Sequence, residues 1–160
     1  MWAGNGGAIA LTTQNGNITT ETLDSHSSDL SYGNGGAIAL STRNGYITTR
    51  DLNSGAAAGN GGAIALTTRN GYITTGNLDS HIDSSSGFVN GAAIALTTEN
   101  GNITTGNLSS RAYTFVGSGG AITFITRNGN ITTGNLDSQG SGYGSGSGGR
   151  SKPYLHPRQH

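Results

Sequence analysis

The stretch GAIALTTQNGNITTETL, from Gly7 to Leu23, decides the fold. Its larger apolar residues alternate with small ones, which is the period of a strand with one buried face. Ile9 and Leu11 are therefore expected to point inward. The Asn15-Gly16 pair that follows predicts a turn, because glycine accepts a positive φ without a Cβ penalty and asparagine tolerates it better than most residues.

A second short strand is expected to begin at Ile18. Ile18 and Leu23 are separated by an odd number of positions, so both can face inward only if the chain bends near residues 21 and 22. Each copy of the stretch is therefore expected to form a coil with two or three sides.

Five copies of this stretch follow one another, and their equivalent isoleucines recur at intervals of 29, 26, 30 and 28 residues. The length varies only after the leucine that ends each copy. Similarity that returns once per whole repeat predicts an all-β fold, a parallel β-helix (β-solenoid) of five coils with 26–30 residues per coil. The expected core residues are Ile9, Leu11, Ile38, Leu40, Ile64, Leu66, Ile94, Leu96, Ile122 and Phe124.

One alternative is an antiparallel barrel or sandwich in which the Asn-Gly pairs form hairpin turns. Hairpins predict similarity between alternating strands, whereas here the similarity spans a whole repeat, which favours the solenoid. Helices are excluded by the period of two and by the abundance of threonine, glycine and asparagine.

The composition excludes several classes of protein. Hydrophobic residues make up 32% of the 160 residues, charged residues make up 10%, and the formal net charge is zero. Without a basic surface a nucleic-acid partner is not expected, and without an apolar window of roughly 18 residues membrane insertion is not expected. No signal peptide is visible, and there is no cysteine. We expect a solenoid domain over residues 1–138 and a flexible Gly/Ser-rich tail over residues 139–160.

Equivalent positions on adjacent coils of a parallel solenoid lie about 4.8 Å apart, so each column of the repeat predicts a ladder of side chains. One unbroken column consists of asparagines, whose amides are expected to hydrogen-bond from coil to coil in a structural role. The column comprises Asn15, Asn44, Asn70, Asn100 and Asn128.

Candidate catalytic and metal-binding residues do not converge in the sequence. Asp24, Asp79 and Asp137 share a column but are separated by intervening coils, so each is interpreted as a solvated corner residue. His26 and His81 share another column two coils apart, or about 9.6 Å, which is too far for one metal ion. The sequence therefore predicts no enzyme, no catalytic residue, no cofactor and no metal site.

The motif Gly-Gly-Ala-Ile-x-Leu-x-Thr-x-Asn-Gly-x-Ile-Thr-Thr-Gly-x-Leu, which Gly62 to Leu78 and Gly120 to Leu136 follow, resembles the repeats of filamentous-haemagglutinin-type exported proteins, especially the large ones of cyanobacteria. The resemblance covers about residues 4–138. It implies a right-handed β-helix and adhesion or display outside the cell or at its surface, with no catalytic residues to carry over.

We therefore expect a non-enzymatic, structural or adhesive β-solenoid segment of a cell-surface or extracellular protein. Its expected partners are its own copies, stacked end to end through open strand edges, or surface glycans. The alternative is a solenoid that binds ice or another flat surface through its outward columns of alanine and threonine. A polysaccharide-active β-helix enzyme is a third and weaker alternative.

Overall fold

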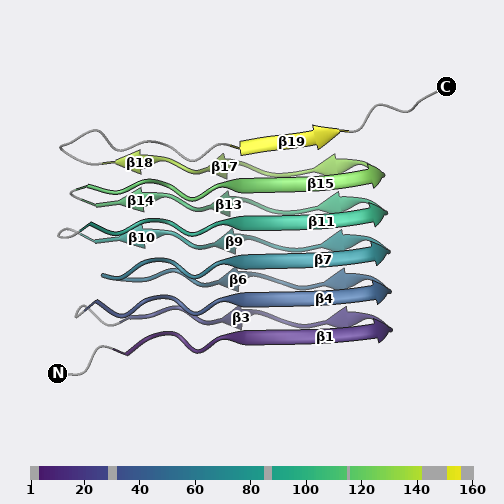
Figure 1. Cartoon of the computed structure of the whole chain (residues 1–160), viewed down its shortest axis with the longest axis horizontal. Coiled ribbons are helices and arrows are strands. Elements are labelled where there is room, and N and C mark those ends of the chain that lie inside the picture. Colours follow the sequence, from purple (N-terminus) through teal and green to yellow (C-terminus); the bar gives the residue numbers. More distant parts are fainter. Residues whose placement is uncertain (1–3, 29–31, 85–87, 115, 142–150, 156–160) are drawn as a thin grey trace.

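A computed structural model of the chain describes residues 4–28, 32–84, 88–114, 116–141 and 151–155. These residues form strands and no helix, and the strands pair in parallel in four sheets. Figure 1 shows the coils stacked one above another, with the long strands aligned on one side of the molecule. The prediction of a parallel β-solenoid is confirmed, and the antiparallel alternative is wrong, because each Asn-Gly pair joins strands of two different sheets.

The long strands form one side of the solenoid, in the order β1 (Ile9–Asn15), β4 (Ile38–Asn44), β7 (Ile64–Asn70), β11 (Ile94–Asn100), β15 (Ile122–Asn128) and β19 (Ser151–Leu155). The second sheet contains β2 (Ile18–Thr19), β5 (Ile47–Thr48), β8 (Ile73–Thr74), β12 (Ile103–Thr104) and β16 (Ile131–Thr132).

A bend after each strand of the second sheet leads to the third sheet, which contains β3 (Leu23–Asp24), β6 (Leu52–Asn53), β9 (Leu78–Asp79), β13 (Leu108–Ser109) and β17 (Leu136–Asp137). The fourth sheet contains β10 (Ile82–Asp83), β14 (Ala112–Tyr113) and β18 (Gly140–Ser141). This short sheet lies in the part of the repeat whose length varies.

The winding is right-handed. In Figure 1 the long strands run from left to right on the near side, the chain returns on the fainter far side, and each coil lies above the preceding one. The strands pair without slippage, so that Ile64 faces Ile38 on one side and Ile94 on the other. This register places every column of the repeat on a line along the solenoid axis.

The core is a stack of isoleucine and leucine side chains inside the coils. Ile38, Leu40, Ile64 and Leu66 are fully buried. The same coils bury Ile47, Leu52, Ile73 and Leu78 in the second and third sheets. In β15 the position that holds leucine in the four preceding long strands is occupied by Phe124, which is also buried. Burying one such aliphatic or aromatic side chain stabilises a protein by about 1.5–3 kcal/mol. The regular stacking therefore gives a lean composition a continuous core.

The first coil is less protected than the inner ones. Leu11 is 38% exposed and Ile9 is half-buried, whereas Leu40 in the next coil is 1% exposed. The cause is that β1 pairs only with β4 among the described strands.

The Asn-Gly turns depend on glycine for a different reason from the one that the sequence suggested. Neither residue of any of these pairs has a positive φ. Instead, a Cβ on Gly45 would overlap the carbonyl oxygen of Gly16 in the preceding coil, and Gly71 stands in the same relation to Gly45. The turn therefore needs glycine because the backbones of stacked corners approach closely.

Two parts of the segment expected to be a flexible tail form strands. β18 pairs with β14, and β19 pairs with β15 from Ile122 to Thr126. The physical reason is that the open edge of a parallel sheet offers backbone donors and acceptors to any extended segment nearby. Residues 142–150 and 156–160 of that segment lie outside the described residues.

Candidate functional site

The asparagine column forms a continuous hydrogen-bonded ladder. The Nδ2 of Asn44 donates to the Oδ1 of Asn15 at 2.8 Å, and that of Asn70 donates to Asn44 at 2.9 Å. Asn100 and Asn128 extend the ladder at 2.9 and 2.8 Å. Each of these four amides donates toward the preceding coil, and Asn15 only accepts. The structure thus brings the five asparagines together in one hydrogen-bonded ladder.

Other corner amides form a second kind of ladder that the sequence interpretation missed. The Oδ1 of Asn34 accepts a hydrogen bond of 2.8 Å from the backbone N–H of Asn60 in the next coil. The Oδ1 of Asn77 does the same for Asn107 at 2.9 Å. These side chains satisfy backbone donors that the corners leave outside the regular sheets.

A column of buried serines was also missed. Ser54 and Ser80 are fully buried, and their hydroxyls donate to the carbonyl oxygen of Gly62 at 2.6 and 2.8 Å. Ser110 donates to the carbonyl oxygen of Ala92 at 2.5 Å. Serine is usual in exposed loops, so only the strict recurrence of Leu-x-Ser in the repeat could have signalled an inward column.

Two exposed columns carry aromatic and charged groups. The rings of Tyr46 and Tyr72 are stacked, with centroids 4.8 Å apart and an angle of 3° between their planes. The Nε of Arg69 lies 2.9 Å from the Oε2 of Glu99. An exposed ion pair of this kind contributes about 0.2–1 kcal/mol, so it has little influence on stability.

Two Asp-His pairs lie on the side of the third sheet. The Nδ1 of His26 is 2.6 Å from the Oδ1 of Asp24, and the Nδ1 of His81 is 2.5 Å from the Oδ1 of Asp79. Both aspartates also accept the backbone N–H of their histidine, at 3.1 and 3.0 Å. Asp24 and Asp79 are thus partly solvated corner residues, as the sequence suggested, but each also has a histidine partner that the sequence interpretation missed.

Asp137 occupies the same column and accepts the backbone N–H of Gln139 at 3.2 Å. Each of the three aspartate carboxylates thus accepts a hydrogen bond from the backbone N–H two residues later in the chain, which closes the same kind of turn on three coils. The Asp-Ser-His triplets at residues 24–26 and 79–81 were the sequence signal for the two side-chain pairs.

His81 has the more elaborate surroundings. Its Nε2 lies 3.2 Å from the Oδ2 of Asp83, and the Oδ1 of Asp83 lies 3.6 Å from the Nη2 of Arg111. The hydrogen bond to Asp79 raises the pKa of His81, burial and the charge of Arg111 lower it, and the balance lies above the usual value. The charges of Asp79 and Asp83 act in the same direction as the hydrogen bond. The ring of His81 is thus held between the carboxylates of Asp79 and Asp83.

Asp24 has a pKa below its usual value. Partial burial of the carboxyl raises the pKa of Asp24, but the hydrogen bonds from the side chain and backbone of His26 lower it by more. The Asp24–His26 pair is therefore favoured with the Asp24 carboxylate ionised.

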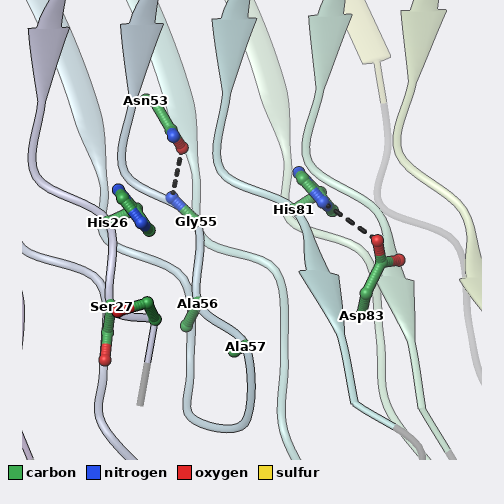
Figure 2. A pocket seen from close by; sticks show the side chains of 9 residues that line it. His26, Ser27, Asn53, Gly55, Ala56, Ala57, His81 and Asp83 are labelled. Atoms are coloured by element: carbon green, nitrogen blue, oxygen red, sulfur yellow. Dashed lines mark hydrogen bonds and ion pairs between the residues drawn. The ribbon is translucent and has the colours of Figure 1, made fainter. Parts of the chain in front are cut away.

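A depression of about 330 Å³ lies between the two histidines. We call it the His trough, and it is lined by His26, Ser27, Ser28, Asn53, Gly55, Ala56, Ala57, His81 and Asp83. Figure 2 shows the two imidazoles on either side of Gly55, whose backbone N–H donates to Asn53 at 3.1 Å. The two histidines, which sequence spacing alone kept apart, thus line one site.

A second, more open depression lies over the long strands. It is lined by outward residues of β1, β4, β7 and β11, including Thr12, Ser41, Thr67 and Thr97. Arg43, Arg69 and Glu99 also line it. These residues form a flat face of hydroxyls beside charged groups.

The described part of the chain contains no group of three or more His, Asp or Glu side chains placed to hold a metal ion. His156 and His160 lie outside the described residues. Among the described residues, no helix has the length and apolar character needed to cross a membrane.

The geometry therefore presents an open strand edge, a flat outward face and the His trough. Comparison of the chain with protein-family models, curated proteins and solved structures finds no match to any of them.

Proposed function

We propose that the chain is a non-enzymatic, structural or adhesive β-solenoid segment of a cell-surface or extracellular protein, and that its copies associate end to end. The observation that carries the proposal is the edge of β1, where Leu11 is 38% exposed and no described strand pairs on the outer side. The likeness of the repeats to those of filamentous-haemagglutinin-type proteins supports the location and the adhesive role.

The β1 edge offers a partner two kinds of interaction. Its free backbone N–H and C=O groups are a template for another strand, and the partly exposed Ile9 and Leu11 would become buried beneath it. Asn15 accepts from Asn44, while its own Nδ2 has no partner among the described residues. A strand from a second copy would therefore extend the sheet, the core and the asparagine ladder together.

The other end of the long sheet differs from the β1 edge. β19 covers β15, and its register places Pro153 opposite Phe124. Proline has no backbone N–H, so this edge offers fewer donors to a further strand. The β1 edge is accordingly the part of the contact that substitutions should test.

Sedimentation velocity over a concentration series, with negative-stain imaging, tests the proposal. The unchanged protein is expected to form oligomers or fibres whose mass rises with concentration. Leu11→Lys places a charge at the open edge and is expected to yield monomers. Thr12→Lys is the matched control, because Thr12 lies on the exposed outward face of the same strand.

A strictly monomeric mass at every concentration would overturn end-to-end association. Equal loss of association in Leu11→Lys and Thr12→Lys would overturn the assignment of the contact to the β1 edge. Adhesion is tested separately by binding to a glycan array. Loss of binding in Thr12→Lys would place the glycan contact on the flat face, and loss in Leu11→Lys would place it at the β1 edge.

The flat face supports a second candidate function, binding to ice or another regular surface. Thr12, Ser41, Thr67 and Thr97 are in register on adjacent strands. A column of alanines runs beside them, formed by Ala10, Ala39, Ala65 and Ala95. Ile125 ends the hydroxyl column at β15. Inhibition of ice recrystallisation that is abolished by Thr67→Lys would support this function, and growth of ice at the rate of buffer alone would exclude it.

A further inference from the structure

Three adjacent coils form a regular grid of side chains around the His trough. The register of the third sheet aligns Asp24, Asn53 and Asp79 on three successive coils. Three residues further along each coil, isolated β-bridges align Ser27, Ala56 and Ile82 in the same way. The next outward column consequently contains His26, Gly55 and His81. The middle coil thus contributes only backbone where its neighbours contribute imidazole rings.

The missing side chain leaves a slot of defined width. The two histidines are two coils apart, about 9.6 Å, so a ring placed midway would lie about 4.8 Å from each imidazole. The solenoid already contains one such contact, since the rings of Tyr46 and Tyr72 stack at 4.8 Å on adjacent coils. A ring in the slot would repeat that contact on both of its faces.

The floor of the slot is kept open by backbone packing. A Cβ on Gly55 would lie 2.7 Å from the carbonyl oxygen of His81, closer than real Cβ atoms approach. Ala57, also in the lining, has only a methyl group to occupy the space. The slot is therefore a built feature of the stacked coils.

The two imidazole walls are held in position by carboxylates. Asp24 fixes the ring of His26 at 2.6 Å, and Asp79 and Asp83 hold the ring of His81 from both of its nitrogens. Figure 2 shows Asp83 on the side of His81 that faces away from His26 and Gly55. There the Oδ1 of Asp83 lies 3.6 Å from the Nη2 of Arg111 on the next coil, so Asp83 supports the His81 wall from behind.

We propose that the His trough binds one flat aromatic ring of the indole or phenol class, stacked between the imidazoles of His26 and His81. The electron-rich face of such a ring attracts a cationic group, which His81 supplies in its protonated form. This site is separate from the β1 edge, so its failure would leave the proposed association of copies unaffected.

NMR titration of the full chain with indole tests the proposal. The imidazole C–H signals are assigned from His26→Gln and His81→Gln. Ring currents are expected to move the signals of both histidines upfield along one saturable isotherm, while those of His156 and His160 stay in place. His26→Ala and His81→Ala are each expected to weaken binding by roughly 2- to 12-fold, the loss of one stacked face.

Three controls sharpen the result. Ala57→Phe fills the trough from its own lining and is expected to abolish the shifts, with circular dichroism showing that the coils remain folded. 1-Methylindole keeps the flat ring but lacks the N–H donor, and it is expected to bind within about 2-fold of indole because stacking carries the contact. Thr67→Ala, on the long-strand face, is expected to bind indole as the unchanged protein does.

Shifts that increase linearly without saturation, or that involve only one of the two histidines, would overturn the sandwiched ring. Glucose that produces the shifts when indole does not would assign the trough to sugars and overturn the aromatic ligand. Failure of 1-methylindole to bind would overturn stacking as the basis of the contact.

Discussion

The hydroxyl of Thr68 donates a hydrogen bond of 2.8 Å to the carbonyl oxygen of Gly45, which joins the buried face of one long strand to the turn of the preceding coil. Thr42, Thr98 and Thr126 make the same contact to Gly16, Gly71 and Gly101, at 2.8, 2.9 and 3.0 Å. These threonines are buried, so the contact supports the corner from inside.

Thr68→Val is expected to reduce the free energy of unfolding by about 1–3 kcal/mol, because it leaves the Gly45 carbonyl without its buried donor. Thr67→Val changes the neighbouring outward residue and is expected to stay within about 0.5 kcal/mol. Urea unfolding of both variants measures the difference. Equal values for the two would show that the inward hydrogen bond contributes nothing.

Gly71→Ala is expected to be strongly destabilising, by about 1–3 kcal/mol or more, because the new methyl group overlaps the carbonyl oxygen of Gly45. Gly16→Ala makes the same change in the first coil, where the nearest atom is the Oγ1 of Thr13 at 3.5 Å. It is expected to cost less than about 0.5 kcal/mol. Thermal unfolding compares the two variants, and similar losses would contradict the stacking argument.

Asn70→Asp tests the asparagine ladder, because a carboxylate still accepts from Asn100 but cannot donate to Asn44. It is expected to lower stability by about 1 kcal/mol, the net value of one hydrogen bond. Asn15→Asp is the control. Asn15 only accepts in the ladder, so its replacement should be nearly neutral, and an equal loss in both variants would refute the donor-acceptor order.

His81 predicts a pH dependence of stability. Because its pKa is raised in the folded protein, chiefly by the hydrogen bond to Asp79, the folded state holds this proton more tightly than the unfolded chain does. The stabilisation is complete below the usual pKa of 6.5 and is lost as the pH rises through the folded-state pKa. The unfolding midpoint is therefore expected to fall between pH 5.5 and pH 8.5.

His81→Gln should remove that fall, whereas His26→Gln leaves His81 with Asp79, Asp83 and Arg111 and should retain it. The comparison uses calorimetric midpoints at both pH values. A fall of the same size in His81→Gln would assign the pH dependence to other groups.

The parallel β-solenoid could be predicted from the sequence because its signals are local and repeated. Alternation at Ile9 and Leu11 gives the strand period, and the fixed offset of each Asn-Gly pair gives the corner. The reason for glycine at Gly45 could not be predicted, because it depends on the distance to Gly16 one coil away. The turn signal alone suggested a positive φ that the structure does not have.

The His trough was harder to predict for a related reason. The sequence placed His26 and His81 in one column and showed that one metal ion could not join them. What it did not show is that Gly55 leaves a lined space between them and that aspartates two residues earlier fix both rings. Such a site depends on three coils at once, whereas the repeat pattern describes one coil at a time.

The one-way order of the asparagine amides gives the molecule a chemical polarity. The first amide of the ladder, on Asn15, presents hydrogens, and the last, on Asn128, presents an oxygen. The register of β19 on β15 ends at Thr126, two residues before that oxygen. Two copies related by a two-fold axis would place amide hydrogens against amide hydrogens, or oxygen against oxygen. Copies that extend this ladder must therefore all point the same way, as in a polar, open-ended filament.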